Sequence, residues 1–276
     1  MAATTRLASR RPRTSDATGA SGAVTSTDLT PTFVTDHSAE GPDFTICTLV
    51  RSQDKYDRLL GSFARTGFTA ANSEFLAADN RDTNRFDGYS WQKALLARAR
   101  GRFVVFCHDD VELLVAGHAQ LLAALADLDR TQPDWLLAGV AGGRYRPEKH
   151  HRRFLRMHIS DPWGEDRLMR TVPGRVETLD ECFIVMRRSR PVIGSYDLDG
   201  FHFYGPDLCL QAELLGGSAH VIDFHLRHYG RGTKDQSFQS ARDRFVRKYA
   251  PLFPGRHLHC TTGVVHLVLP EGQEGG

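Results

Sequence analysis

Residues 103–113 read FVVFCHDDVEL, a short apolar run followed directly by a histidine and two aspartates. The run is too short for a helix and is rich in β-branched and aromatic residues, which predicts a buried strand over 103–107. Unpaired carboxylates are costly to bury, so we expect Asp109 and Asp110 to face a crevice at the strand end. In open α/β sheets such crevices bind ligands, and carboxylates there suit a divalent cation that holds phosphates. A simpler alternative is that these acids only cap a helix.

Apolar segments alternate with amphipathic segments on both sides of this strand. Further strands are predicted over 44–50, 74–78, 135–141, 175–179, 182–187 and 219–224, and helices over 56–65, 90–100, 117–128, 207–215 and 237–249. This alternation is typical of βαβ units around a mostly parallel sheet. Residues 144–170 carry seven arginines, and we expect them to form a loop-rich insertion over the active edge of the sheet.

The composition narrows the class of protein. With 276 residues and 41% hydrophobic content, the chain suits one large domain or two small ones. A net charge of +2 argues against nucleic acid as a partner, and we expect no membrane span. The five cysteines form no C-x-x-C pair and most lie in apolar runs, which favours a reducing cytoplasm. Residues 1–42 lack periodicity and predict a disordered tail, with a transit peptide as the alternative.

The order of these elements, with the acidic cluster at the third strand end, resembles nucleotide-sugar-dependent glycosyltransferases of the GT-A fold. The likeness is greatest to family 2, in particular to its bacterial branch with a histidine in the acidic motif. It covers about residues 43–250 and rests on four segments: 45–52, the region of Asp79, 108–110 and 200–210. The resemblance implies an α/β fold with a Rossmann-like, mostly parallel central sheet flanked by helices, and an additional small antiparallel part.

The resemblance also implies a divalent cation, Mn²⁺ or Mg²⁺. Residues 108–110 look like an Asp-x-Asp motif in which His108 replaces the first acid, so Asp110 would bind the cation that bridges to the donor diphosphate. A histidine after the last strand commonly completes this site in the fold, and His228 is the candidate, with His225 as its competitor. The cation, or arginine donors in its place, would neutralise the charge on the leaving group.

Several positions would bind the donor if the resemblance holds. Asp79, at the end of the second strand, would bind the nucleobase. The glycine-punctuated, basic loop over 230–235 would close over the diphosphate, although an ordinary solvated turn is the alternative. The residues implied in donor binding are Val50, Arg51, Asp79, Asp109, Arg231 and Lys234.

An acceptor hydroxyl needs a general base as it attacks the anomeric carbon. Residues 200–210 resemble the segment that holds this base, with Pro206-Asp207 where the family often has Glu-Asp. Asp207 is therefore the first candidate, and a helix N-cap is its alternative role. Glu181 is the second candidate. The residues expected to bind the acceptor are Asp180, His202, Arg152 and Arg153.

Together these features imply a metal-dependent, hexosyltransferase-type glycosyltransferase that is cytoplasmic and inverting. It would move a sugar from a nucleotide-diphosphate donor to a hydroxyl or other nucleophile of an unidentified small molecule, glycan or peptide. The alternatives are a nucleotidyltransferase and a non-catalytic sugar-nucleotide-binding module of the same fold. A homodimer is compatible with the sequence. We expect a tail over 1–42, a nucleotide-sugar-binding half over 43–143, an acceptor-binding and catalytic half over 144–256, and a C-terminal extension over 257–276.

Overall fold

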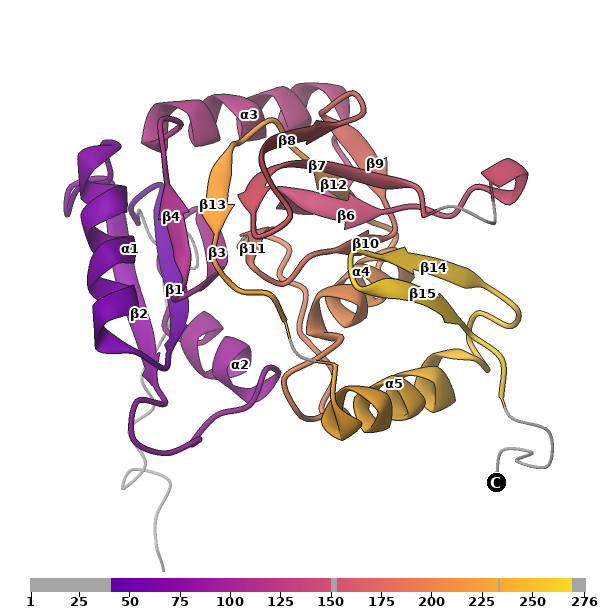
Figure 1. Cartoon of the computed structure of the whole chain (residues 1–276). Coiled ribbons are helices and arrows are strands. Elements are labelled where there is room, and N and C mark those ends of the chain that lie inside the picture. Colours follow the sequence, from indigo (N-terminus) through magenta and orange to yellow (C-terminus); the bar gives the residue numbers. More distant parts are fainter. Residues whose placement is uncertain (1–40, 150–152, 233, 270–276) are drawn as a thin grey trace, which may run out of the picture. The chain divides into compact units, whose positions relative to one another are not determined.

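The computed structural model describes residues 41–149, 153–232 and 234–269 (Figure 1). These residues belong to one compact unit, Ala39–Gly276. Almost all of the predicted tail lies outside the described residues, and the predicted boundaries at 143 and 256 stay predictions. None of the helices in the described part of the chain has the length and apolarity needed to cross a membrane.

A seven-stranded sheet forms the centre of this unit. Its order is β2 (Ser73–Asp79), β1 (Phe44–Val50), β3 (Phe103–His108), β11 (Phe183–Arg187), β5 (Trp135–Gly139), β12 (Ser218–Val221) and β9 (Gly174–Val176). Strands β11 and β9 run antiparallel to their neighbours, and the other strands run parallel to one another, which confirms the mostly parallel central sheet. Leu49 of β1 pairs with His108 of β3, so the turn after β1 lies beside the acidic cluster.

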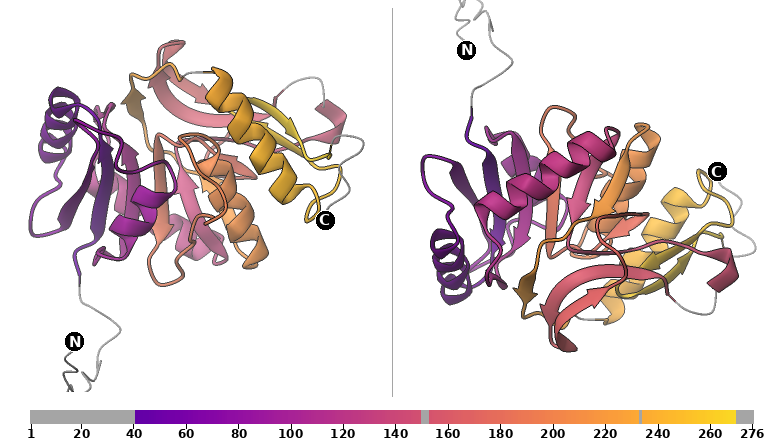
Figure 2. Two further views of the ribbon diagram at one scale, coloured as in Figure 1. Left: turned by 90° about the horizontal axis from the view of Figure 1, so that it is seen from below. Right: turned by 90° about the horizontal axis from the view of Figure 1, so that it is seen from above.

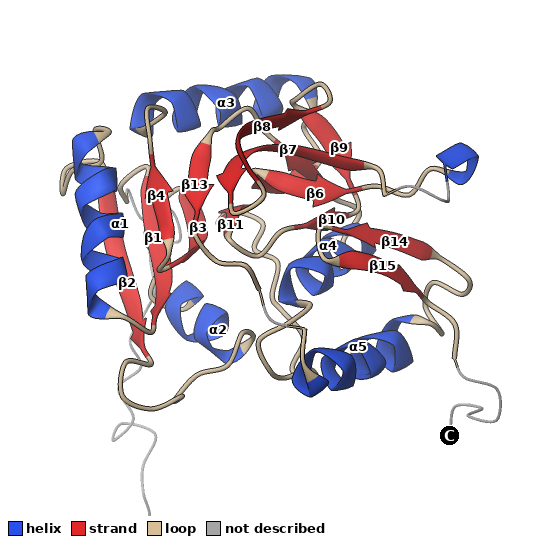
Figure 3. Cartoon of the chain, in the orientation of Figure 1, coloured by secondary structure: helices blue, strands red, loops and turns tan. Residues whose placement is uncertain are grey.

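Helices cover both faces of this sheet (Figures 2 and 3). In β3, Phe103 and Val105 pack in the core cluster that contains α1 (Gln53–Arg65) and α3 (His118–Thr131). The alternate residues Val104 and Phe106 pack in the cluster of α2 (Ser90–Leu96) and α4 (Tyr204–Leu214). Because both faces are buried, β3 is apolar at every position rather than at alternate ones.

A second sheet lies beside the first and carries much of the site. Its order is β10 (Thr178–Leu179), β6 (Ala141–Gly143), β7 (Leu155–Asp161), β13 (Leu226–His228) and β4 (Val111–Leu113), with β8 (Gly164–Met169) paired to β7. The remaining elements are α5 (Gln236–Tyr249) and the hairpin of β14 (His257–Cys260) and β15 (Gly263–His266). These elements supply the additional antiparallel part. His228 of β13 pairs with Val111 of β4, which brings it next to Asp110.

Four sequence predictions about these elements were wrong. The strand predicted over 175–179 is two strands, β9 in the central sheet and β10 in the second sheet. The insertion over 144–170 is not loop-rich throughout, because β7 and β8 form a hairpin in it. Leu155, Met157 and Ile159 alternate with polar residues, which is the pattern of a half-buried strand that the many arginines obscured. The strand predicted over 135–141 is interrupted at Val140, so that β5 and β6 belong to different sheets. The helix predicted from 207 begins at Tyr204.

Candidate active site

Two cavities meet at His108, which lines both of them. The turn-side cavity, of about 270 Å³, lies against the turn after β1 and is lined by Arg51, Lys55 and Phe201 among others. The sheet-side cavity, of about 440 Å³, lies against the inner face of the second sheet. The loop after β13 and the segment between β10 and β11 also line this larger cavity. The arrangement offers adjacent compartments for two groups, with β3 ending between them.

Three potential metal ligands gather where the cavities meet: His108, Asp110 and His228. His228 Nε2 lies 3.3 Å from Asp110 Oδ1, and His108 Nδ1 lies 3.9 Å from the same oxygen. Their potential ligand atoms all lie within 4.8 Å of one another. The structure thus brings together the three residues that the sequence predicted for the metal, from the ends of β3 and β13.

A hydrogen bond between Nε2 of His108 and Tyr204 fixes the orientation of the imidazole ring. His108 Nε2 lies 2.5 Å from the hydroxyl oxygen of Tyr204, and this hydroxyl donates to the carbonyl of Glu181 at 3.5 Å. When the hydroxyl donates to that carbonyl, it accepts from Nε2–H, and the lone pair of Nδ1 then faces Asp110. Burial and the neighbouring His228 lower the pKa of His108, so the ring is neutral at neutral pH. A ligand histidine held through its other nitrogen is the usual arrangement in metal sites.

Asp110 and His228 form a charge pair. Burial alone would raise the pKa of Asp110, but the hydrogen bond from His228, the charge of His228 and the charge of Lys55 lower it. Burial opposes protonation of His228, yet the bond to Asp110 and the charge of Asp180 raise its pKa above the usual value. A cation that binds here would displace the proton from His228.

The donor set fits a divalent transition-metal ion. Two imidazole nitrogens and one carboxylate favour Mn²⁺ or Zn²⁺ over Mg²⁺, which prefers oxygen ligands. Asp180, Cys182 and His228 form another group within the same distance limit. However, burial and the charge of Asp180 raise the pKa of the Cys182 thiol well above its usual value, so it is a poor ligand. The competitor His225 lies elsewhere and is hydrogen bonded to Ser160.

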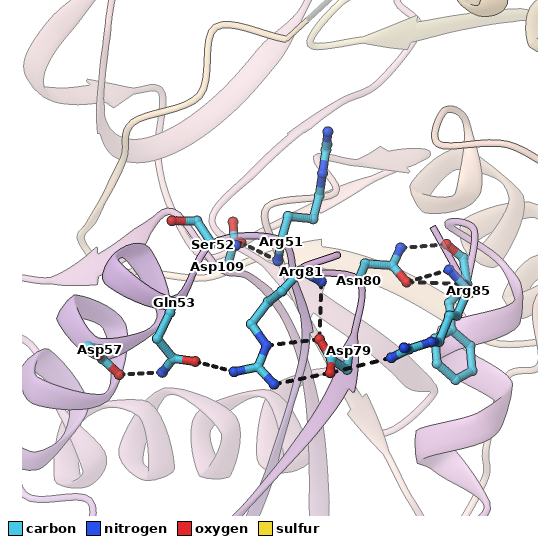
Figure 4. Close-up of polar contacts among 10 residues, drawn as sticks. Arg51, Ser52, Gln53, Asp57, Asp79, Asn80, Arg81, Arg85 and Asp109 are labelled. Atoms are coloured by element: carbon cyan, nitrogen blue, oxygen red, sulfur yellow. Dashed lines mark hydrogen bonds and ion pairs between the residues drawn. The ribbon is translucent and has the colours of Figure 1, made fainter. Parts of the chain in front are cut away.

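Asp109 has a positioning role rather than a place in the metal cluster. Its Oδ2 accepts the backbone N–H groups of Arg51 at 2.7 Å and Ser52 at 3.0 Å (Figure 4). Ser52 is the N-cap of α1, so Asp109 fixes the turn between β1 and α1. The Arg51 guanidinium lies 5.8 Å from the centre of the Phe201 ring, and both residues line the turn-side cavity. Val50, predicted to bind the donor, is buried and lines neither cavity.

Asp79 also lies outside both cavities. Its carboxylate accepts from Arg81 at 2.9 Å and is paired with Arg85 at 3.5 Å (Figure 4). These arginines, Arg81 foremost through its hydrogen bonds, lower the pKa of Asp79. The carboxylate is thus engaged by arginines of its own loop.

The first candidate base, Asp207, is fully buried. Its alternative role as a helix N-cap is wrong, because the N-cap of α4 is Phe203, with a φ of 67°, and Asp207 lies within the first turn. Its carboxylate accepts from the backbone N–H of Ser195 at 2.9 Å and from the hydroxyls of Ser195 and Tyr249, both at 2.5 Å. The structure therefore places Asp207 in a buried hydrogen-bond network, away from both cavities.

Glu181, the second candidate, lines the sheet-side cavity next to Asp180. It accepts the backbone N–H of Gly205, at the start of α4, at 3.3 Å. A Cβ at position 205 would lie 3.0 Å from Cγ of Glu181, so the glycine leaves room for this side chain. Burial and the charge of Asp180 raise the pKa of Glu181 to about 8. A carboxyl group in a cavity with a pKa near neutrality is suited to general acid or base chemistry.

Most other predicted site residues line the sheet-side cavity. They are Arg153, Asp180, His202, Arg231 and Lys234. Arg152 lies outside the described residues. Sequence reasoning missed Lys55, Phe201 and Tyr204 in the turn-side cavity. Lys55 had a usable signal, since it is one of only five lysines and follows the first strand at the start of a helix.

The fold is that of GT-A glycosyltransferases. Its TM-score is 0.51 with GalNAc-T7, solved with UDP, GalNAc and Mn²⁺, at 10% identity over 75% of this chain and 47% of that one. With TarS of S. aureus the TM-score is 0.50 at 14% identity, over 75% of this chain and 40% of that one. The chain thus spans less than half the length of these two proteins. The predicted GT-A fold is confirmed.

Comparison with other sequences identifies a relative of this chain. No family model matches the sequence. A protein of Fuscovulum blasticum described as "ATP synthase subunits region ORF 6" is 55% identical over 237 residues, which is 86% of this chain and 95% of that protein. At this identity and coverage, the chain belongs to the family of the Fuscovulum blasticum ATP synthase subunits region ORF 6 protein.

Proposed function

We propose that this chain is a family 2-like glycosyltransferase that moves a sugar from a nucleoside diphosphate to an acceptor hydroxyl. The observation that carries the proposal is the cluster of His108, Asp110 and His228 at the junction of two cavities, with Glu181 on the wall of the larger one. Because the GT-A fold alone does not fix an activity, the proposal rests on these side chains.

We assign the nucleoside to the turn-side cavity. Arg51 and Phe201 there offer a cation and an aromatic face, and Lys55 Nζ lies 3.8 Å from Asp110 Oδ2. The diphosphate would then lie at the junction of the cavities. The metal cluster would hold a divalent cation, preferably Mn²⁺, which as a Lewis acid stabilises the negative charge on the leaving diphosphate. Arg231 and Lys234 add positive charge on the opposite side.

The donor sugar and the acceptor would share the sheet-side cavity. Glu181 would accept the proton of the acceptor hydroxyl as its oxygen forms a bond to the anomeric carbon. The bond from that carbon to the diphosphate oxygen breaks, and the nucleoside diphosphate leaves. A single base acting on the face opposite the leaving group gives inversion. Asp180, His202 and Arg153 line the same cavity and would contact the acceptor.

A donor screen tests this proposal. The full chain is incubated with UDP- and GDP-sugars in Mn²⁺, in Mg²⁺ and in EDTA, and the melting temperature and released products are measured. We expect at least one donor to stabilise the protein, most strongly with Mn²⁺, and to be slowly hydrolysed to nucleoside diphosphate and free sugar. Stabilisation without turnover would indicate a binding module. Failure of every donor to stabilise the protein, with or without metal, would contradict the proposal.

Gly230→Ala is expected to weaken metal-dependent donor binding by roughly 10–100-fold with little change in melting temperature. A Cβ at Gly230 would lie 2.9 Å from both Asp110 Oδ2 and His228 Nε2, so the methyl group would displace two potential ligands. Gly263→Ala is the matched control, because a Cβ there would have no neighbour within 4 Å. Donor titration in Mn²⁺ measures the effect, and equal affinities of the two variants would show that Gly230 does not adjoin the bound cation.

A further inference from the structure

The second sheet carries another histidine–carboxylate cluster on its outer face. Met157 and Ile159 of β7 line the sheet-side cavity, so His158 between them faces the opposite side of the sheet. Its ring stacks on that of His225, with the ring centres 4.7 Å apart and the planes 9° from parallel. We call His158, Asp166, Asp223 and His225 the outer cluster. It is separate from the cluster of the proposed active site.

The outer cluster converges on one carboxylate oxygen. His158 Nε2 lies 3.0 Å and His225 Nε2 lies 3.9 Å from Oδ1 of Asp166. One potential ligand atom from each of these three residues lies within 4.8 Å of those of the other two. In tetrahedral zinc sites with bonds of about 2.0–2.1 Å, ligand atoms are roughly 3.4 Å apart. The two histidine–carboxylate separations bracket that value, and binding would also turn the two parallel rings so that both Nε2 lone pairs face one ion.

His158 lies between two carboxylates. Its Nδ1 lies 2.6 Å from Asp223 Oδ1, and its Nε2 faces Asp166 at 3.0 Å. A neutral imidazole has one N–H and can donate to only one of these carboxylates. If Nδ1–H donates to Asp223, the lone pair of Nε2 faces a carboxylate oxygen, and this contact is favourable only with a second proton or a cation between them.

The backbone conformation of Asp166 places its side chain next to the two histidines. Its φ of 40° is in the left-handed region that residues other than glycine seldom adopt. The backbone N–H of Asp166 donates to Ser160 Oγ at 3.0 Å, and the same hydroxyl contacts His225 Nε2 at 2.9 Å. A metal ion bound here would replace the contact between Ser160 Oγ and His225 Nε2.

We propose that the outer cluster binds a divalent transition-metal ion, zinc being the best match, through Nε2 of His158, Nε2 of His225 and the carboxylate of Asp166. Asp223 would orient His158 through its Nδ1–H, as carboxylates do for metal-bound histidines. Two imidazoles and one carboxylate with an open fourth position suit Zn²⁺. The ion would tie the β7–β8 hairpin to the chain entering β13, which ends at His228.

The test uses the full chain with Asp110→Asn, which removes the carboxylate of the active-site cluster. The protein is stripped with EDTA, and the affinity for Zn²⁺ is measured by calorimetry and by thermal stabilisation. We expect one zinc ion per chain. Adding Asp166→Asn should weaken binding by at least about 100-fold, and adding Asp223→Asn by about 10–100-fold. Asparagine tolerates a positive φ, so the Asp166→Asn turn should keep its fold.

Glu165→Gln is the matched control. Glu165 adjoins Asp166 and has the same side-chain exposure, 71%, but pairs with Arg227 instead of the histidines. This substitution should leave zinc affinity unchanged. The proposal is overturned if the Asp110→Asn protein binds no zinc, or if Asp166→Asn and Glu165→Gln bind it equally. The outer cluster would then be a network of ion pairs alone.

Discussion

Glu181→Gln is expected to lower the rate of sugar transfer by about 10²–10⁴-fold while donor affinity stays unchanged. Glutamine keeps the size of the side chain and can still accept the N–H of Gly205, but it cannot take a proton from an acceptor hydroxyl. The turnover number and the donor dissociation constant are measured separately. A loss of turnover without a loss of binding identifies the base, because a purely structural role would change both.

Asp207→Asn supplies the contrasting result. Its carboxylate accepts hydrogen bonds from Ser195 and Tyr249 inside the core, so the variant should melt at a lower temperature and keep its turnover below that temperature. If a folded Asp207→Asn protein lost transfer and Glu181→Gln did not, the base would be Asp207, the first candidate from the sequence.

The pH dependence follows from the raised pKa of Glu181. The base acts as the carboxylate, so kcat/KM of the wild type should rise with pH and level off above about 8, and the Gln variant should lack this rise.

The stability of the folded chain should change with pH in the opposite direction. In the folded chain Glu181 keeps its proton up to a pH of about 8, whereas in the unfolded chain it releases the proton above its ordinary pKa of 4.5. The wild type therefore loses stability as the pH rises from 4.5 to about 8. The melting temperature of the Gln variant should therefore exceed that of the wild type increasingly across this window.

Strand ends were the most informative part of the sequence. The apolar run of β3 predicted that the acids at its end would face a crevice, and the resemblance indicated His108, Asp110 and His228 as metal ligands. The structure brings all three together because β13 pairs with β4 directly after Asp110. The position of Asp79 at a strand end did not predict the contacts of its carboxylate, because a strand end fixes where a residue lies but not which side chains surround it. Arg81 and Arg85, only a few residues further on, engage its carboxylate.

Helix-capping rules misplaced the start of α4. Pro206-Asp207 suggested a helix start at 207, but proline is also tolerated in the first turn of a helix, where it stands here. The left-handed Phe203 begins the helix earlier and turns Asp207 into the core. No pattern of spacing marked Glu181, because its position depends on the turn between β10 and β11 and on the glycine at 205. The outer cluster was equally hidden, since its residues come from segments about 60 residues apart in sequence.

Asp110→Asn is expected to remove the metal-stimulated part of donor binding, with metal affinity lowered by at least about 100-fold. The side chain keeps its size but loses the charge that pairs with His228 and holds the cation. His108→Ala should have a smaller effect, because a neutral ligand contributes less to a cation than a carboxylate does. Titrations of the donor with and without Mn²⁺ measure both variants.

Glu112→Gln is the control for this experiment. Glu112 lies two residues further along the chain, but it pairs with Arg65 and Tyr229 rather than with the cluster, so its loss should leave the metal dependence intact. Donor affinity and turnover that survive both EDTA and Asp110→Asn would contradict a metal-dependent reaction. The charge on the leaving diphosphate would then have to be neutralised by basic residues that line the two cavities around His108, among them Lys55, Arg231 and Lys234.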